Sequence, residues 1–258
     1  ENKPKMVSLF SGCGGLDLGF ETAGFNIIWA NDFDSDAQAV YKLNLGKIDG
    51  RDILDVSEEE IPDCDILTAG FPCQPFSSAG NRKGVHDSRG MLYKECLRII
   101  EKKMPKVIVF ENVRGLLSTK YIDGRKLVDV IVEDLSTMNN VGYNVDYKLI
   151  NASDYGVPQN RQRVLFVGVR KDLGINFAFP EKQEKKGLTL ENIFQIADYA
   201  LTSKGSLYIV NRAQRLDELI ILGNKYNIGI KKIQLIKTKK DRAPSLVIVK
   251  AVKNSKKH

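Results

Sequence analysis

Histidine, tryptophan and cysteine are scarce in this chain of 258 residues, and their scarcity argues against several kinds of site. The sequence has 2 histidines, 1 tryptophan and 4 cysteines. No two cysteines form a CxxC pair, and zinc sites need clustered Cys and His ligands, so we expect no metal. Four scattered cysteines also make a disulfide framework improbable. The cysteines are Cys13, Cys64, Cys73 and Cys96.

Long apolar runs are also missing. No stretch approaches the roughly 20 apolar residues that a transmembrane helix needs. The first residues show no charged segment followed by an apolar run and a cleavage site, so we expect no signal peptide. At 43% hydrophobic residues the chain can still bury a sizeable core. We therefore expect a soluble, cytoplasmic protein without membrane contact.

Acidic residues are few towards the end of the chain. Residues 187–258 hold 14 Lys and Arg against 5 Asp and Glu, a charge of +9, whereas the whole chain carries +7. Residues 1–186 therefore carry 7 − 9 = −2. This asymmetry suits contact with a polyanion such as nucleic acid. It also suits a lysine-rich surface that simply faces water.

Apolar runs alternate with amphipathic stretches over the first two thirds of the chain. This alternation is typical of βαβ units, and it predicts an α/β fold with a twisted, mostly parallel sheet covered by helices on both faces. Ligands of such sheets bind beyond the carboxyl ends of the strands. The predicted strands are 6–10, 26–31, 65–69, 106–110, 145–150 and 164–169, and the predicted helices are 15–23, 35–44, 90–103 and 125–138.

A charged segment separates this region from a second one. Residues 180–187 read PEKQEKKG, which indicates a linker or exposed loop. We therefore divide the chain into a catalytic and cofactor-binding domain (1–180), a linker (181–187) and a basic α/β segment (188–258). In the last, we predict helices 190–201 and 213–226, a strand 206–210, and an antiparallel hairpin of strands 229–236 and 245–252. Its apolar strands are expected to complete the main sheet.

A glycine-rich turn follows the first strand. It reads FSGCGGLD from Phe10 to Asp17, and it lacks the third glycine of a dinucleotide-binding turn because Asp17 stands there. The charge of Asp17 would oppose a pyrophosphate, so a zwitterionic ligand fits better. The second strand ends in NDFD (31–34), where Asp32 can bind a ribose diol. The glycines could instead serve packing alone.

Two further strands end in residues that can carry chemistry. The third leads into GFPCQPFS (70–77), where Cys73 follows a proline at the ligand edge and could act as a nucleophile. A lone cysteine can equally be an inert buried residue. The fourth strand ends in ENV, which brings Glu111 to the same edge. Glu111 could also be a helix cap.

Taken together, FSGCGG, NDFD, GFPCQPFS, ENVRG (111–115) and QNRQR (159–163) resemble the DNA cytosine-5 methyltransferases over residues 7–170. The resemblance implies a Rossmann-like class I methyltransferase fold and S-adenosylmethionine as cofactor. It also implies that a flipped cytosine of double-stranded DNA enters the site. By this resemblance, Cys73 attacks carbon 6 of the base, Glu111 is protonated and bonds to N3, Arg163 contacts O2, and Arg161 positions the base or meets the DNA backbone.

The same resemblance implies a set of cofactor contacts. Phe10 would contact the adenosine, Gly12 and Gly14 the methionine end, and Asp32 the ribose. Phe33 would lie on the adenine face and Asp52 at the adenine amine, with Pro72 and Leu92 lining the cleft. Ser77 and Ser78 belong to the loop expected to close over the DNA, with 81–88 as its mobile part.

The tail departs from the family pattern. We find neither of the two motifs that normally follow a target-recognition domain. Instead SKGSLYIV (203–210), the predicted helix over 212–219 and APSLVIV (243–249) carry a weaker resemblance to the last part of transfer-RNA adenine-N6 methyltransferases. The chain is thus a composite or divergent one, or part of a split enzyme whose partner subunit recognises the target. We expect a DNA cytosine-5 methyltransferase of a restriction-modification system. The alternatives are an RNA cytosine-5 methyltransferase and a catalytically incomplete cofactor-binding protein.

Overall fold

The computed structural model describes residues 3–72, 91–121, 123–157, 159–183, 189–237, 239 and 241–254. It divides into two compact units. The first comprises residues 1–152 and 160–182, and the second comprises 153–159 and 183–258. The chain thus passes between the units at 182–183, inside the charged segment. The grouping of 153–159 with the second unit is a feature that the sequence does not indicate.

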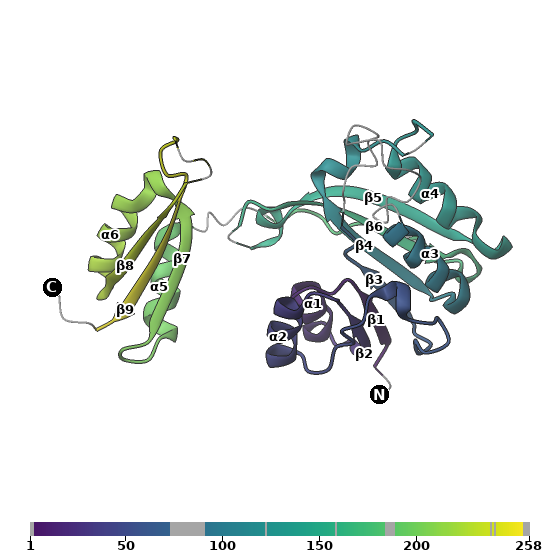
Figure 1. The fold of residues 1–258 in the computed structure, drawn as a ribbon, viewed down its shortest axis with the longest axis horizontal. Coiled ribbons are helices and arrows are strands. Elements are labelled where there is room, and N and C mark those ends of the chain that lie inside the picture. The colour runs from purple at the N-terminus through teal and green to yellow at the C-terminus, as the bar shows by residue number, and fades with distance from the viewer. Residues whose placement is uncertain are drawn as a thin grey trace. The chain divides into compact units, whose positions relative to one another are not determined.

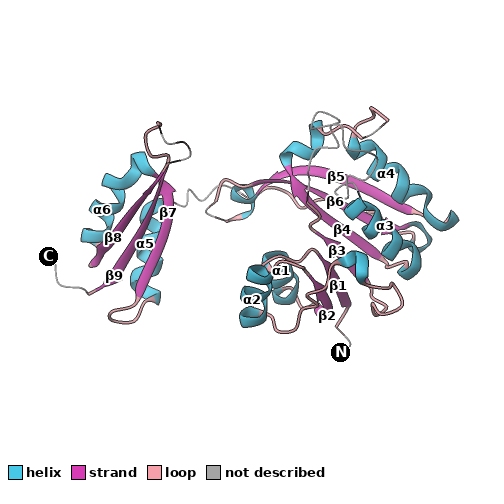
Figure 2. Ribbon diagram, in the orientation of Figure 1, coloured by secondary structure: helices cyan, strands magenta, loops and turns pink. Residues whose placement is uncertain are grey.

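The first unit is built around a six-stranded sheet (Figures 1 and 2). Its strand order is β2-β1-β3-β4-β6-β5. The pairs β1–β2, β1–β3 and β3–β4 are parallel, whereas β6 runs antiparallel to both β4 and β5. The strands are β1 (Lys5–Leu9), β2 (Asn26–Asn31), β3 (Ile66–Ala69), β4 (Val107–Val113), β5 (Tyr143–Asn151) and β6 (Gln162–Arg170).

Four helices flank this sheet, with α1 and α2 on one side and α3 and α4 on the other (Figure 1). They are α1 (Gly15–Thr22), α2 (Ser35–Asn44), α3 (Met91–Lys103) and α4 (Leu127–Thr137). The central strands β1 and β3 are buried as continuous runs, as expected where both faces of a sheet are covered: β3 is buried at all four positions and β1 at four of five. The predicted α/β fold with a mostly parallel sheet is therefore confirmed.

The second unit has a sheet and a core of its own. Its three strands are ordered β7-β9-β8, with β9 antiparallel to both neighbours, so the predicted terminal hairpin is confirmed as β8–β9. Helices α5 and α6 pack on one face of this sheet around Phe194 and Leu219, which are fully buried. The elements are α5 (Leu190–Ala200), β7 (Ser206–Arg212), α6 (Leu216–Lys225), β8 (Ile228–Ile236) and β9 (Leu246–Lys253).

One expectation about the tail is wrong. Strands 207–210 and 246–249 do not complete the main sheet, because they pair with each other as parts of β7 and β9. The physical reason is local: β9 inserts between β7 and β8, and two amphipathic helices of the same segment cover the apolar face. Both the backbone bonds and the core are thus satisfied within the tail. In the described residues, no helix is long and apolar enough to cross a membrane.

Candidate functional site

The carboxyl ends of four parallel strands meet along one edge of the main sheet. Along this edge, the ends of β2, β1, β3 and β4 follow one another in space. The start of the antiparallel β6 comes next. Asp32, Phe10, Gly70 and Glu111 therefore follow one another along the edge, and Arg163 comes next because it pairs with Val113. The topology places the two predicted parts of the site, cofactor and base, side by side.

The glycine turn after β1 is joined to the end of β2 by a carboxylate. The Gly12 N–H donates to Asp32 Oδ2 at 2.7 Å, and the Asp34 N–H donates to Asp32 Oδ1 at 2.9 Å. Each oxygen of Asp32 thus accepts one backbone bond and keeps a lone pair for another donor. Phe33, the next residue, leaves 66% of its surface exposed. Asp32 and Phe33 are therefore both available to a ligand at this edge.

Gly12 and Gly14 both have left-handed backbones, with φ of 55° and 85°. A Cβ on Gly12 would meet nothing within 4 Å, so the space beside it is open. A Cβ on Gly14 would lie 2.3 Å from Leu45 Cδ1 and 2.9 Å from Tyr41 Cδ2. Gly12 therefore leaves room beside the turn, whereas Gly14 allows α1 and α2 to approach each other. Phe10, which begins the turn, is half-buried with φ of 53°.

Asp17 does not face the ligand edge. It is fully buried, and its oxygens accept bonds from Ser8 Oγ at 2.7 Å and from Tyr41 OH at 2.8 Å. Burial raises the pKa of this carboxyl above its ordinary value, although the two hydroxyls partly oppose the shift. Contrary to the expectation, Asp17 therefore presents no charge to a ligand at this edge, because the first turn of α1 directs its side chain towards Tyr41 of α2.

Asn31, which was not predicted as a site residue, holds the segment before Asp52 at the same edge. The buried Asn31 donates from Nδ2 to the carbonyls of Asp49 and Arg51, at 3.1 and 2.9 Å. These bonds hold the segment before Asp52 against the end of β2. Asp52 itself is exposed and caps a short 3-10 helix by accepting from the Leu54 N–H at 3.1 Å. A polar residue at the end of a buried strand was the available signal for Asn31.

The loop after β3 is held by a second missed residue. Asn112 is 3% exposed, and its Nδ2 donates to the Phe71 carbonyl at 2.9 Å. Phe71 is buried, whereas Pro72 is exposed. Asn112 therefore fixes the backbone two residues before Cys73. Cys73, Ser77, Ser78 and 81–88 lie outside the described residues. Leu92, near the start of α3, is half-buried against the core of the first unit.

Glu111 lies beside both predicted arginines. The Arg163 Nε donates to Glu111 Oε1 at 2.7 Å, and a terminal nitrogen of Arg161 lies 3.9 Å from the same oxygen. Glu111 and Arg163 are diagonal neighbours on β4 and β6, close enough for their side chains to meet. Both are mostly buried, at 28% and 23% exposure, whereas Arg161 is half exposed. The structure thus brings these three predicted residues together.

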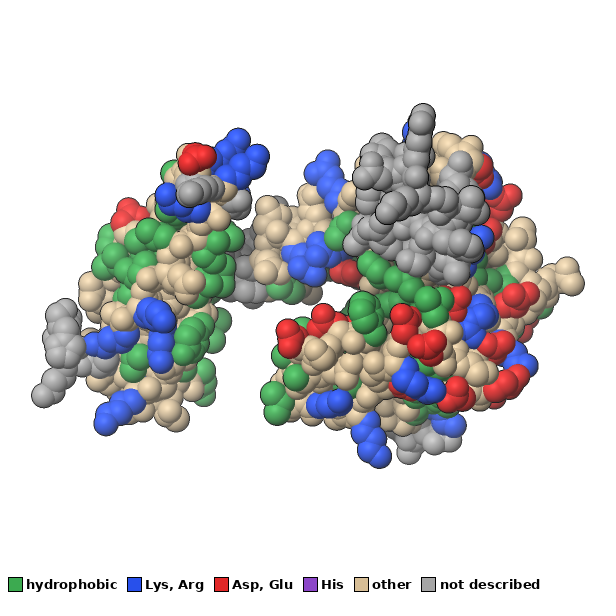
Figure 3. Space-filling view, viewed as in Figure 1, with side chains coloured by type: hydrophobic (Ala, Val, Ile, Leu, Met, Phe, Trp, Pro, Cys, Tyr) green, Lys and Arg blue, Asp and Glu red, His purple; other side chains and the backbone are tan. Residues whose placement is uncertain are grey.

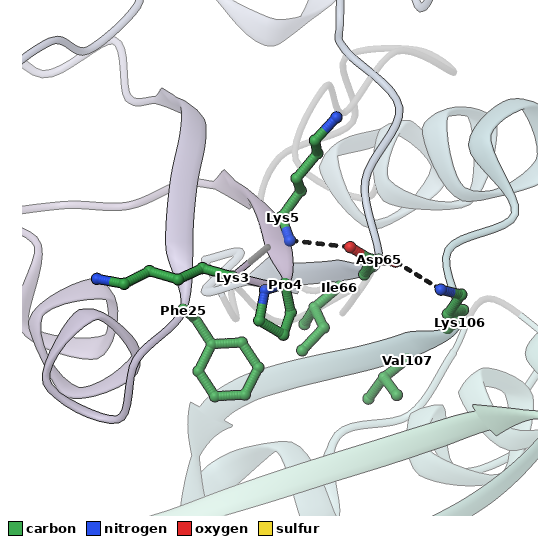
Figure 4. Close-up of a pocket in the computed structure, with 8 residues that line it drawn as sticks. All are labelled: Lys3, Pro4, Lys5, Phe25, Asp65, Ile66, Lys106 and Val107. Carbon is green, nitrogen blue, oxygen red and sulfur yellow. Dashed lines mark hydrogen bonds and ion pairs between the residues drawn. The ribbon is translucent and has the colours of Figure 1, made fainter. Parts of the chain in front are cut away.

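A pocket of about 480 Å³ lies at the opposite edge of the sheet, where β1, β3 and β4 begin (Figure 4). Its one carboxylate, Asp65, accepts from the Lys5 backbone N–H and from Lys106 Nζ, at 2.9 and 2.7 Å. Lys106 is the main cause of the lowered pKa of Asp65. The pocket contains no predicted site residue. In the described ranges, no group of three or more His, Cys, Asp or Glu could hold a metal ion.

Comparison with known proteins gives one family over almost the whole chain. The family model described as C-5 cytosine-specific DNA methylase matches residues 4–257. This range continues past residue 170, where the recognisable motifs end, and so includes the basic tail. The resemblance of the tail to adenine-N6 enzymes stays a prediction.

Curated relatives and a solved structure agree with that match. The chain is 41% identical over 241 residues to the type II methyltransferase M.NgoFVII of Neisseria gonorrhoeae, covering 87% of this chain and 62% of the relative. It is 42% identical over 230 residues to M.FnuDI of Fusobacterium nucleatum, covering 87% and 63%. The chain therefore spans about three fifths of these relatives. The fold is similar to that of the Schizosaccharomyces pombe Dnmt2 methyltransferase, with a TM-score of 0.59 and 22% identity over 74% of this chain and 60% of that one.

Proposed function

Because the chain belongs to the C-5 cytosine-specific DNA methylase family, we propose that it transfers a methyl group from S-adenosylmethionine to carbon 5 of cytosine in DNA. The observation that carries this proposal is the cluster of Glu111, Arg161 and Arg163. It lies at the sheet edge where β3 ends, and Cys73 follows β3 in the sequence. The chain spans about three fifths of its curated relatives, so the activity of the whole protein is part of the proposal.

The residues at the cofactor end of the edge fit this cofactor. The open space beside Gly12 admits the methionine end, and Asp32 retains acceptor capacity for ribose hydroxyls. The exposed ring of Phe33 would offer a face to the adenine, and the exposed Asp52 would offer an acceptor to the adenine amine. When bound, the cofactor supplies the electrophilic methyl group. Phe10, Gly14, Pro72 and Leu92 complete the proposed cleft.

The base end of the edge would carry out the covalent step. Carbon 5 of cytosine is a weak nucleophile, so the thiolate of Cys73 adds to carbon 6 and raises the electron density at carbon 5. After methylation the proton on carbon 5 is removed, and Cys73 leaves from carbon 6. Arg163 binds O2 of the base, and Arg161 positions the base or meets the DNA backbone.

Glu111 is proposed to act in its protonated form, which would donate a hydrogen bond to N3 and withdraw charge from the ring as the adduct forms. Its Oε1 accepts from Arg163 Nε at 2.7 Å in the structure. We propose that Arg163 binds the neighbouring O2 of the base.

The DNA partner is a duplex whose target cytosine is flipped out of the helix, because the reacting carbons are not accessible inside the stack. The two curated relatives are type II methyltransferases, which supports a role in a restriction-modification system. Such a role places the protein in the cytoplasm with the DNA.

Transfer of a tritiated methyl group to duplex DNA, followed by nucleoside analysis, tests the proposal. We expect label on 5-methylcytosine, and we expect Cys73→Ser to abolish it while cofactor affinity changes by only a few fold. Label on adenine alone contradicts the proposed chemistry. A structured RNA that outperforms DNA in the same assay favours the alternative of an RNA cytosine-5 methyltransferase. Equal losses of turnover and cofactor binding in Cys73→Ser make Cys73 structural.

The second candidate rests on the family motifs that were not found after residue 170. In this candidate, the chain binds the cofactor and requires a partner subunit for target recognition. Calorimetry that detects cofactor binding to a chain without transferase activity supports this candidate. Activity that returns when the partner is added identifies a split enzyme. Full activity of the isolated chain excludes the need for a partner.

A further inference from the structure

In the part of the second unit that the structure describes, one face of the sheet has no helical layer (Figure 1). Strand pairing aligns its residues in three rows: Tyr208, Lys250 and Lys232; then Val210, Ile248 and Gln234; then Arg212, Leu246 and Ile236. We call these nine residues the open sheet face. Tyr208 and Val210 are 64% and 62% exposed. Within the described residues, neither α5 nor α6 packs over these two side chains.

The other face of the same sheet shows what a covered surface looks like here. Val247, Val249 and Ala251 alternate along β9 with the residues of the open sheet face and are completely buried. They pack against α5 and α6, so both helices lie on that side. The open sheet face therefore differs from its reverse by the lack of a covering layer and by its content of cations.

Charge on the open sheet face has one sign. Its charged residues are Arg212, Lys232 and Lys250, and β7, β8 and β9 contain no Asp or Glu. The five carboxylates of residues 187–258 lie elsewhere: two on α5, two on α6 and one in the turn after β8.

Three of those carboxylates form ion pairs with cations outside the open sheet face. Glu191 pairs with Lys225, Asp198 with Lys253, and Glu218 with Arg215. In the space-filling view, basic and hydrophobic side chains lie next to each other on this unit, whereas many acidic ones gather on the first (Figure 3).

These charges decide which occupant suits the face. A second copy would bring two basic surfaces together, which costs energy through like-charge repulsion. A polyanion gains energy instead by releasing its counterions. The aromatic ring narrows the choice between kinds of nucleic acid. Lys250 Nζ lies 5.5 Å from the centroid of the Tyr208 ring, so the face combines an aromatic ring with a cation. Single strands present base faces and phosphates in that combination, whereas a duplex hides its base faces.

We propose that the open sheet face binds single-stranded nucleic acid, with a base stacked on Tyr208 and phosphates bound by Arg212, Lys232 and Lys250. Ile248 and Val210 add an apolar floor beside the stacked base. This binding is separate from methyl transfer and does not depend on Cys73 or Glu111. It assigns the basic charge of the tail to a defined surface, distinct from the turn that carries Lys237 and Lys239.

Fluorescence anisotropy with labelled oligothymidylate and oligouridylate of about 15 nucleotides tests the proposal in the full chain. Tyr208→Ala should weaken binding by about 5- to 150-fold, the range for loss of one stacked base. Tyr208→Phe should retain binding. The matched control is Tyr199→Ala, since Tyr199 is 94% exposed on α5, on the helical side of the unit. Circular dichroism verifies that each variant is folded.

A second pair of variants separates the face from the turn. Neutralising Lys232 and Lys250 to Gln should reduce the log-log salt slope by about 1.4, which corresponds to two single-strand phosphate contacts. The same change at Lys237 and Lys239 removes equal charge and should leave the slope nearly unchanged. If both pairs lower the slope equally, the basic tail binds without using this face, and the proposal is wrong.

Photocrosslinking identifies which part of the chain contacts the oligonucleotide, which affinity measurements do not show. An oligonucleotide carrying 5-iodouracil should crosslink to the tryptic peptide 205–212, which contains Tyr208, and the Cys73→Ser chain should crosslink equally well. The proposal is overturned if the chain does not bind the oligonucleotide, or if it binds a duplex equally well. It is also overturned if the Tyr208→Ala and Tyr199→Ala variants bind with equal affinity, or if crosslinks are confined to the first unit. Light scattering that shows a dimer which Tyr208→Ala dissociates overturns it too, because that result makes the face an interface between copies.

Discussion

Replacing Gly14 by alanine should destabilise the first unit more than replacing Gly12, because the two glycines share a left-handed backbone but differ in their surroundings. Either substitution places an alanine in the left-handed conformation, which costs about 1–2 kcal/mol of folding free energy. The Cβ at Gly12 meets nothing within 4 Å, so we expect no further cost there. The Cβ at Gly14 would lie 2.3 Å from Leu45 and 2.9 Å from the ring of Tyr41.

The extra cost at Gly14 depends on what can move. The end of Leu45 is a flexible methyl group, but Tyr41 is 1% exposed and its hydroxyl bonds to the buried Asp17. Moving the ring therefore disturbs a buried polar network, and overpacking of this kind costs about 1–3 kcal/mol. We expect a total loss of roughly 2–5 kcal/mol for Gly14→Ala, against about 1–2 kcal/mol for Gly12→Ala.

Urea unfolding monitored by tryptophan fluorescence measures the difference. The chain has one tryptophan, Trp29 in β2, so the signal reports on the first unit alone. Adding Leu45→Ala to Gly14→Ala should recover part of the loss, which a double-mutant cycle quantifies. Equal unfolding midpoints for the Gly12 and Gly14 variants, with equal slopes, would refute this account of the turn.

Three other predictions concern Asp32, Asp17 and Asn112. Asp32→Ala should weaken cofactor binding by about 1–3 kcal/mol through loss of charge-assisted bonds; unchanged affinity in calorimetry would contradict the proposed cofactor position. Because burial raises the pKa of Asp17, the folded state holds that proton more tightly than the unfolded one, so stability should fall as pH rises from the ordinary value of 3.8 through the raised pKa. Urea unfolding at a series of pH values should show this decline in the parent chain and not in Asp17→Asn, and parallel pH profiles would count against it. Asn112→Leu removes the donor to the buried Phe71 carbonyl, which should cost about 1–3 kcal/mol of stability. It should also lower turnover more than cofactor affinity, since the bond lies two residues before Cys73; kinetics and calorimetry on the folded variant separate these effects, and a pure affinity loss would refute that role.

Local sequence patterns were sufficient to predict most of the helices and strands. The predicted helix 90–103 is observed as Met91–Lys103 and the predicted strand 229–236 as Ile228–Ile236. Hydrophobic period and turn residues are properties of neighbouring positions, so they can be read without the fold. The candidate residues Asp32 and Glu111 were found for a similar reason: in a parallel sheet, the position of a residue at a strand end already determines the edge on which it lies.

Only the tertiary structure decided which strands pair and which polar groups meet. The hairpin of β8 and β9 follows from a local pattern, but the tail folds as a separate sheet because β9 also pairs with the more distant β7, and no local pattern encodes that pairing. The bonds from Asn31 and Asn112 to loop carbonyls likewise join residues 18 to 41 positions apart. The burial of Asp17 depends on where α2 brings Tyr41. Hydrophobic spacing defines the elements, whereas long-range packing and hydrogen bonding select one arrangement of them.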